Sequence, residues 1–330
     1  MMQQLIESFK GKKVLIVGDV MVDAYIIGKV DRISPEAPVP VVNIEKLENR
    51  LGGAANVALN IAALNAIPIL CSVIGNDKDG HELLNIMRQE NLTSEGIVQS
   101  NDRKTTIKTR VLGNKHQLLR IDSEMTADLN QNDEQQLIRI FRQYITDCDV
   151  VILEDYNKGV LTEKNIPQLI AIAKEAGKPV AVDPKKNNFL SYRHVTLFKP
   201  NLKEIKEGLN SDKNLKEKNN LREAVAQLNS ILDNTYTMVT LSEDGVLMTD
   251  HKDYKFIPAH LRNIADVSGA GDSVISVASL CIACGAEMSV VAQLANLAGG
   301  LVCEENGVVP INVDKLIVEA NHLQYAIKEA

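Results

Sequence analysis

The sequence predicts an α/β fold built on a doubly wound, mainly parallel β-sheet with helices on both faces. From residue 132 onward, helical segments alternate with short apolar strands, an order typical of parallel sheets. Earlier, residues 13–17 form a compact run of strand-favouring residues, of the kind found in the first buried strand of a parallel sheet. With 330 residues and 45% hydrophobic content, the chain can form one large domain with an appendage, or two small domains.

In the first part of the chain, a short amphipathic helix at 3–10 precedes the strand at 13–17. Short strands carrying interspersed charges are then expected at 24–30 and 40–47, on either side of a Pro-rich stretch. The next expected elements are a helix opened by Gly52 and Gly53 and running to residue 64, a strand at 69–75, a helix at 81–90, and strands at 105–112 and 115–121.

Gly113 and Asn114 separate the last two of these strands, which is a hairpin signal. Together with the strands at 24–30 and 40–47, this hairpin predicts a small second β-sheet. It would be built from two insertions, at approximately 24–47 and 104–122, and we interpret it as a lid.

The second part of the chain continues the alternation of helices and strands. Helices are expected at 132–144, in a segment that ends at residue 176, and at 202–209, 221–232, 273–305 and 313–330. Strands are expected at 150–153, 180–182, 195–198, 237–241, 246–249 and 254–257. The last two strands have the spacing of a hairpin.

Composition excludes several classes of function. The net charge is −7 without an extended basic block, so a nucleic-acid partner is not expected. Five cysteines, mostly in apolar runs, indicate reduced thiols of a cytoplasmic protein, and Cys281 and Cys284 lack the second ligand pair of a metal site. The first residues lack the layout of a signal peptide, and no apolar run approaches membrane-spanning length, so a soluble protein without a membrane partner is expected.

The segment 266–273, Asp-Val-Ser-Gly-Ala-Gly-Asp-Ser, predicts a glycine-opened helix start. Backbone N–H groups at such a start form an anion site suited to phosphate. Asp272 beside it can be the base that takes a proton from an attacking hydroxyl. The alternative is structural: Asp266 caps the helix and Asp272 is a favourable acid in its first turn.

Polar residues follow nearly every predicted core strand. These ends are Gly18-Asp19, Glu154-Asp155-Tyr156, Asp183-Pro-Lys185, Lys199-Pro-Asn201 and the stretch 240–245. Ligands of open α/β sheets bind beyond the carboxyl ends of the strands, so these ends predict a binding crevice.

Two common nucleotide motifs are missing. Gly75 and Gly80 have the glycine spacing of a P-loop, but His81 stands where the lysine is required. The segment after the first strand lacks the G-x-G-x-x-G of a dinucleotide site.

The motifs that are present resemble those of the ribokinase-like (PfkB) carbohydrate kinases. They are Gly52-Gly53-x-x-Asn56, Asn201-x-x-Glu204 and the late D-x-x-G-A-G-D at 266–272, in the order of that family. The resemblance covers essentially the whole chain and implies one ribokinase-like kinase domain, residues 1–330, with the inserted lid. It also implies ATP as phosphoryl donor, Mg²⁺ as cofactor and a sugar as acceptor.

Within the family, the chain most resembles the kinases of D-glycero-β-D-manno-heptose 7-phosphate. The similarity lies in residues 14–23, 32–40, 52–58, 155–160 and 182–185. It implies phosphorylation of the anomeric C1 hydroxyl to the 1,7-bisphosphate, in ADP-heptose synthesis for the lipopolysaccharide core. Ser268 and Ser273 replace the usual threonines and keep both hydroxyls. No His-x-Gly-His occurs, so the nucleotidylyltransferase fused in many relatives is not expected here.

The resemblance also implies roles for individual residues. Asp272 would be the base, with the N–H groups of Gly269, Ala270 and Gly271 holding charge on the transferring group. Asp23, Gly52, Gly53 and Asn56 would hold sugar hydroxyls. The candidates for binding the 7-phosphate are Lys158 and Lys185, which are preferred, and Arg103, Lys104 and Arg120.

On the nucleotide side, Asn201 and Glu204 would orient Mg²⁺ through water, although the same pair fits an ordinary helix cap. Thr240, Ser242, Gly245 and Asn296 would border the nucleotide; without the family, Asn296 would be taken for a helix-surface residue. A homodimer joined through the lids is expected, because the lid strands have an apolar side. The alternative functions are a kinase of another sugar, sugar phosphate or nucleoside, and a non-catalytic sugar-nucleotide sensor.

Overall fold

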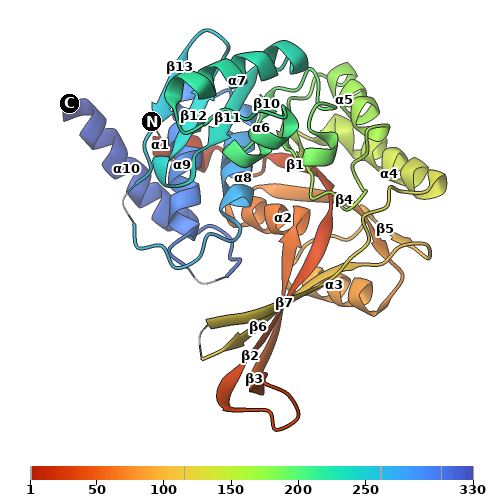
Figure 1. Cartoon of the computed structure of the whole chain (residues 1–330). Coiled ribbons are helices and arrows are strands. Elements are labelled where there is room, and N and C mark those ends of the chain that lie inside the picture. The colour runs from red at the N-terminus through yellow and green to blue at the C-terminus, as the bar shows by residue number, and fades with distance from the viewer. Residues whose placement is uncertain (1, 115, 261, 306, 330) are drawn as a thin grey trace.

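The computed structural model describes residues 2–114, 116–260, 262–305 and 307–329. These residues form a large sheet of nine strands in the order β13-β12-β11-β10-β9-β8-β1-β4-β5 (Figure 1). The strands are β1 (Lys13–Gly18), β4 (Ile67–Gly75), β5 (Ile97–Ser100), β8 (Val150–Glu154), β9 (Val180–Asp183), β10 (Leu197–Phe198), β11 (Tyr236–Thr240), β12 (Val246–Thr249) and β13 (Tyr254–Ile257). Neighbours from β5 to β11 pair in parallel, and β12 and β13 form an antiparallel edge.

Helices cover both faces of this sheet, as the doubly wound prediction requires. Val14 and Ile16 of β1 pack into one core, whereas Leu15 and Val17 pack into the other, because successive side chains of a strand point to opposite faces. The first core is closed by α1 (Met2–Glu7), α2 (Ala54–Ala63), α3 (Lys78–Gln89), α8 (Ala270–Ala283), α9 (Met288–Val302) and α10 (Val313–Glu329). The second is closed by α4 (Gln131–Tyr144), α5 (Asn165–Glu175), α6 (Leu202–Gly208) and α7 (Lys218–Leu232).

A smaller four-stranded sheet extends from one side of this body (Figure 1). Its strands, in the order β3-β2-β6-β7, are β2 (Val20–Ile33), β3 (Pro40–Gly53), β6 (Thr106–Gly113) and β7 (His116–Ser123). The second sheet predicted from the two insertions is therefore present. We call it the small sheet.

The small sheet differs from the prediction in the length of two strands. β2 and β3 have 14 residues each, whereas short strands were expected; β2 begins among buried residues and β3 ends among them. Gly52 and Gly53 pair with Met21 and Val20, so they end β3 and do not lie in the helix, which starts at Ala54. The first residue of the predicted 115–121 strand and the last of the predicted 313–330 helix lie outside the described residues.

The remaining elements agree with the prediction within a few residues, with two exceptions: the helical stretch expected at 273–305 is divided into α8 and α9, and β5 was missed. β5 has only four residues, too few to show a hydrophobic period. Among the described helices, none combines the length and the apolarity needed to cross a membrane.

Candidate active site

Charged side chains gather where β8 and β9 end. Glu154 and Asp183 are paired residues of these adjacent parallel strands, so their side chains leave the sheet on the same face. Helix α8 packs against both strands and brings Asp272 to the same place. One carboxylate oxygen from each of Glu154, Asp183 and Asp272 lies within 4.8 Å of the other two. We call these three residues the carboxylate cluster.

Asp272 is held by two hydrogen-bond donors. Asn56 Nδ2 donates to Oδ2 at 2.6 Å, and the Tyr156 hydroxyl donates to Oδ1 at 2.8 Å. Burial raises the pKa of Asp272 to about 6, against the opposing effect of these donors. The carboxylate is thus mostly ionised at neutral pH, yet basic enough to accept a proton from a substrate hydroxyl.

The start of α8 is open toward the carboxylate cluster. Gly269 is the N-cap residue with φ of 81°, and no side chain caps the helix. A Cβ at Gly271 would lie 3.6 Å from Asp183 Oδ2 and 3.7 Å from Lys199 Nζ. The first-turn N–H groups and a buried ammonium group therefore share one small region, which suits an anion.

Asp266 does not cap α8, so that part of the structural alternative is wrong. Its carboxylate accepts hydrogen bonds from the backbone N–H groups of Ser268, at 2.9 Å, and Gly307, at 3.1 Å. Asp266 thereby ties the loop before α8 to the loop after α9. Asp272 lies in the first turn, as both interpretations of the motif expected.

Two lysines accompany the carboxylate cluster. Lys199 Nζ lies 2.7 Å from Asp183 Oδ2, and Lys185 Nζ lies 3.3 Å from Asp183 Oδ1 and 2.9 Å from Glu204 Oε1. Burial lowers the pKa of Lys199, but Asp183 and Glu204 outweigh burial and raise it. Both lysines are therefore cationic.

Glu154 has no such partner. It is 0% exposed, and neither of its carboxyl oxygens has a hydrogen-bond partner among the described residues. Burial, then the charges of Asp183 and Asp272, raise its pKa well above the ordinary value. Sequence reasoning noted Glu154, Asp183, Lys199 and Tyr156 only as polar strand ends. The pairing of Glu154 with Asp183 across adjacent strands, the ion pair of Lys199 with Asp183 and the hydrogen bond of Tyr156 to Asp272 bring them together.

Four residues predicted to hold the sugar form a path toward Asp272. Asp23, on β2, is 4% exposed and pairs with Arg110 of β6. A Cβ at Gly52 would lie 2.4 Å from Asp23 Oδ2, so only glycine leaves room for this carboxylate. Gly53 joins β3 to α2, and Asn56 on α2 reaches Asp272.

Asp19 organises the segment that carries Tyr156. Its carboxylate accepts hydrogen bonds from the backbone N–H groups of Tyr156, Lys158 and Val160 at 2.8 to 3.0 Å. Burial, then the charge of Asp155, raise the pKa of Asp19 to about 6. The Asp19 side chain therefore fixes the backbone from which Tyr156 reaches Asp272.

The predicted phosphate-binding cations lie in three places. Arg103, Lys104 and Lys158 line a small polar cavity of about 10 Å³ next to Asp19. Lys185 lies against the carboxylate cluster, where it pairs with Asp183, and it also pairs with Glu204. Arg120 is not brought to either place: its side chain is 53% exposed on the small sheet and pairs with Asp122 on its own strand.

The predicted nucleotide residues surround the end of β11. Asn201 and Glu204 form a capping box at the start of α6, with hydrogen bonds of 2.9 and 2.8 Å, so the capping interpretation is confirmed. Thr240 forms a β-bridge with Asn201. Ser242 and Gly245 form the turn after β11, with φ values of 54° and 93°.

Asn296 is not the helix-surface residue that its position in the sequence alone suggested. It is 8% exposed on α9, and its Nδ2 donates to the Pro258 carbonyl at 2.8 Å. Its side chain therefore anchors the segment after β13.

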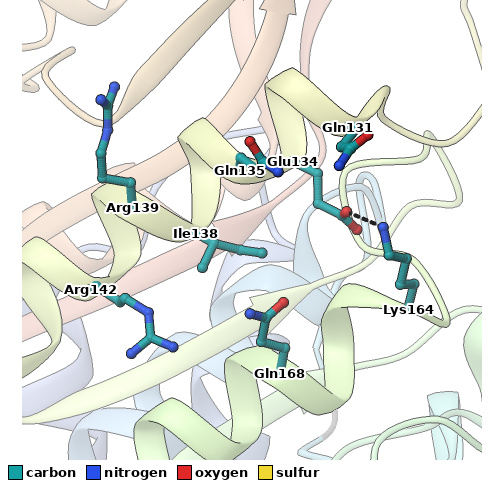
Figure 2. A pocket seen from close by; sticks show the side chains of 8 residues that line it. All are labelled: Gln131, Glu134, Gln135, Ile138, Arg139, Arg142, Lys164 and Gln168. Atoms are coloured by element: carbon teal, nitrogen blue, oxygen red, sulfur yellow. Dashed lines mark hydrogen bonds and ion pairs between the residues drawn. The ribbon is translucent and has the colours of Figure 1, made fainter.

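A separate groove of about 410 Å³ lies between α4 and α5 (Figure 2). Glu134 and Lys164 form an ion pair of 2.7 Å across it. The groove is lined by Gln131, Glu134, Gln135, Ile138, Arg139, Arg142, Lys164 and Gln168. None of the predicted site residues lines it, so the groove is not part of the active-site candidate.

Comparison with known proteins identifies the family to which the chain belongs. The model of the pfkB family of carbohydrate kinases matches residues 11–315. The bifunctional protein HldE of Desulfatibacillum aliphaticivorans is 39% identical over 312 residues, which cover 94% of this chain and 63% of the relative. The HldE protein of Caulobacter vibrioides is 40% identical over 320 residues, covering 96% of this chain and 65% of the relative. The chain thus spans less than two thirds of the length of these relatives.

Solved structures show the same fold. Phosphofructokinase-2 from Escherichia coli in complex with potassium has a TM-score of 0.77 at 20% identity, covering 94% of this chain and 99% of that one. A putative ribokinase from Agrobacterium tumefaciens has a TM-score of 0.73 at 16% identity, with coverage of 94% and 99%. The fold is ribokinase-like, and the chain belongs to the pfkB family of carbohydrate kinases, phosphotransferases that act on a sugar hydroxyl.

Proposed function

We propose that this chain transfers the γ-phosphoryl group of ATP to the anomeric C1 hydroxyl of D-glycero-β-D-manno-heptose 7-phosphate. The product is the 1,7-bisphosphate, a precursor in ADP-heptose synthesis for the lipopolysaccharide core. The similarity to heptose 7-phosphate kinases in residues 32–40 and 155–160 supports this substrate, as do the HldE relatives. Because ATP is the donor, we propose a cytoplasmic location.

The observation that carries the chemistry is the position of Asp272 at the open start of α8. The anomeric hydroxyl attacks the γ-phosphorus and gives its proton to Asp272 Oδ1 or Oδ2, while the bond from phosphorus to the leaving ADP oxygen breaks. The N–H groups of Gly269, Ala270 and Gly271 stabilise the charge on the transferring group. Lys199 Nζ, beside Gly271, adds a fixed positive charge.

Substrates are held on two sides of Asp272. Asp23, with Gly52, Gly53 and Asn56, binds sugar hydroxyls, because carboxylate and amide oxygens accept their hydrogen bonds. Thr240, Ser242, Gly245 and Asn296 border the nucleotide.

The residues predicted to orient Mg²⁺ fit an outer-shell contact. Glu204 uses one oxygen for Asn201 N–H and the other for Lys185, and each oxygen keeps a lone pair that can accept from metal-bound water. When bound, Mg²⁺ neutralises charge on the nucleotide phosphates. Asn201 and Glu204 would hold its waters.

We propose that the 7-phosphate binds where the small sheet meets the large sheet, because Arg103, Lys104 and Lys158 line one cavity there. Its volume of about 10 Å³ holds about one water, so these side chains must move apart to admit a phosphate. Lys158 is at present paired with Glu124 at 2.9 Å, an ion pair that the phosphate would replace. Arg120 is a weaker candidate for binding the 7-phosphate, because its side chain is exposed and pairs with Asp122. Lys185 is also a weaker candidate, because it pairs with Asp183 and Glu204.

The test is phosphoryl transfer from Mg-ATP to the heptose 7-phosphate, with fructose 6-phosphate and ribose as competing acceptors. The expected product is the β-anomeric 1,7-bisphosphate, identified by ³¹P NMR. Transfer only to another sugar would leave the base assignment standing and overturn the substrate. No transfer to any acceptor, with ATP still bound, would favour a non-catalytic sensor.

We also propose a homodimer joined through the small sheet. Seven of the large hydrophobic side chains that are exposed in the described residues lie on this sheet and its loop: Ile33, Val39, Ile44, Leu47, Leu118, Leu119 and Ile121. Burial of such a face stabilises association. Light scattering at micromolar concentration should give twice the chain mass of 36.2 kDa, and a monomeric mass would refute the dimer.

A further inference from the structure

Helix α8 lacks the side-chain cap that fixes the start of many helices. Its N-cap residue is Gly269, so no side chain caps the first turn. This arrangement leaves the first turn open to the transferring phosphoryl group, as proposed above. The position of that turn must therefore be fixed from the side, by contacts with neighbouring elements.

Helix α2 holds the first turn of α8 through two asparagines that lie one turn apart. Asn56 donates to Asp272, as described above, and Asn60 Oδ1 accepts a hydrogen bond of 2.9 Å from the Ser273 hydroxyl. Residues four apart lie on the same face of a helix, so both asparagines face α8. Because Asp272 and Ser273 are consecutive, the two bonds together restrict sliding and rotation of the first turn against α2.

Asn60 also binds the segment that follows α9. Its Oδ1 accepts a second hydrogen bond, of 3.1 Å, from the backbone N–H of Ile311. A backbone N–H can only donate, so this contact fixes the orientation of the amide, whose Nδ2 donates to the Asn56 carbonyl at 2.9 Å. Asp266 binds the N–H of Gly307 in the same segment. The loop before α8, its first turn and this segment are thus fixed to one another.

Asn60 is not placed to bind a substrate itself. It is 0% exposed, and its oxygen already accepts two hydrogen bonds, one for each lone pair. Asn56 differs, because its Oδ1 has no hydrogen-bond partner among the described residues and can accept from a sugar hydroxyl. Asn56 is therefore available to a substrate, whereas any effect of Asn60 must pass through the residues that it holds.

We propose that Asn60 is a positioning residue for phosphoryl transfer, which acts through Ser273 to keep Asp272 and the first-turn N–H groups in place. The inference rests on the role of Asp272 as base in the proposed function. A displacement of about 1 Å at a reacting group can lower a rate about 100-fold, so a buried hydrogen bond to the neighbour of the base should affect turnover. Because ATP and sugar are held mainly by other residues, kcat should change more than KM.

Ser273→Ala removes the hydroxyl that reaches Asn60, and Ser279→Ala is the matched control. Both serines lie on α8 and are 0% exposed, but the Ser279 hydroxyl donates to the Ile275 carbonyl of its own helix, at 2.7 Å. Ser273→Ala should lower kcat at least about fivefold relative to Ser279→Ala, with both KM values changed by less than about twofold. Ser273→Thr keeps a hydroxyl and should recover most of the turnover.

The Ser273 hydroxyl also lies 3.3 Å from the Gly269 carbonyl, so Asn60 must be varied as well. Asn60→Leu keeps a branched side chain and removes its hydrogen bonds. The double variant Asn60→Leu, Ser273→Ala should turn over about as slowly as the slower single variant, because both changes break the same contact. Additive losses would overturn the claim that Asn60 acts through Ser273. Should Asn60→Leu fail to fold, Ser273→Ala and its control still decide.

Hydrogen exchange of the substrate-free, full-length chain provides a test that does not depend on activity. Exchange at the amides of residues 270–273 should be faster in Ser273→Ala and Asn60→Leu, and at Ile311 in Asn60→Leu, but not in Ser279→Ala. Unchanged exchange at these amides, or equal kcat in the two serine variants, would overturn the inference.

Failure of this inference is separate from failure of the proposed substrate. The exchange measurement needs neither sugar nor nucleotide, and the kinetic comparison uses whichever acceptor the wild type phosphorylates.

Discussion

The hydroxyl of Tyr156 donates a hydrogen bond of 2.8 Å to Oδ1 of Asp272, the carboxylate whose pKa is raised to about 6. This bond favours the ionised form. Tyr156→Phe should therefore raise the pKa of Asp272, and the acid limb of the kcat/KM profile should move upward by about one pH unit. The profile is measured at constant free Mg²⁺, from pH 5 to 9.

Tyr192→Phe is the matched control, because the Tyr192 hydroxyl donates a bond of 2.7 Å to Asp155 and does not touch Asp272. Its acid limb should stay near that of the wild type. If Tyr156→Phe lowers activity equally at every pH, Tyr156 has only a structural role.

Asp272→Asn removes the proposed base while keeping the side-chain shape. ATP binding, measured by isothermal titration, should be retained, and turnover should fall by about 10² to 10⁴. Turnover within about tenfold of the wild type, or about 1.4 kcal/mol, would contradict the assignment of Asp272 as base.

The two glycines that flank α8 provide a paired test of the proposed anion site at the start of this helix. Gly269 and Gly285 have φ values of 81° and 69°, so alanine is strained at both. Around Gly285 nothing lies within 4 Å of an added Cβ, but at Gly269 it would lie 3.1 Å from Asn56 Nδ2. Asn56 holds Asp272.

Both glycine variants should lose similar stability, about 1 to 2 kcal/mol each, in thermal unfolding. Only Gly269→Ala should also lose turnover, by about tenfold or more beyond Gly285→Ala. Equal turnover in the two variants would show that the contact with Asn56 is unimportant for catalysis.

Asp19→Ala should destabilise the protein and loosen the segment that carries Tyr156. Three backbone N–H groups lose their acceptor, which costs about 3 kcal/mol or more if they stay buried. Hydrogen exchange should accelerate at Tyr156, Lys158 and Val160. Asp133→Ala, at another buried aspartate, should lower stability without faster exchange at those amides.

The sequence was sufficient for most of the fold because its signals are local. Apolar runs, glycine-opened helices and the Gly113-Asn114 turn each reveal an element without knowledge of its neighbours. β5 was missed because four residues carry no period, and β3 was shortened because Gly52 and Gly53 suggest a helix start as readily as a strand end.

The site was less predictable because it depends on register. Sequence motifs identify Asp272 and Asn56, and the structure joins them by a hydrogen bond. Nothing local in the sequence shows that Glu154 and Asp183 are direct partners on adjacent strands. Nor does the sequence show that Arg120 faces solvent, since it lies on β7, an edge strand of the small sheet that is exposed along nearly its whole length.

The two long strands of the small sheet project from the large sheet, so a rotation about their buried ends displaces the far ends most. Over 14 residues, β2 extends roughly 45 Å, and Asp23 lies only about 10 Å from its start. A rotation of about 5° at Val20 therefore moves the far end by nearly 4 Å but Asp23 by less than about 1 Å. The far end of the small sheet can thus shift to fit a packing partner, whereas Asp23 stays close to its position relative to Asp272.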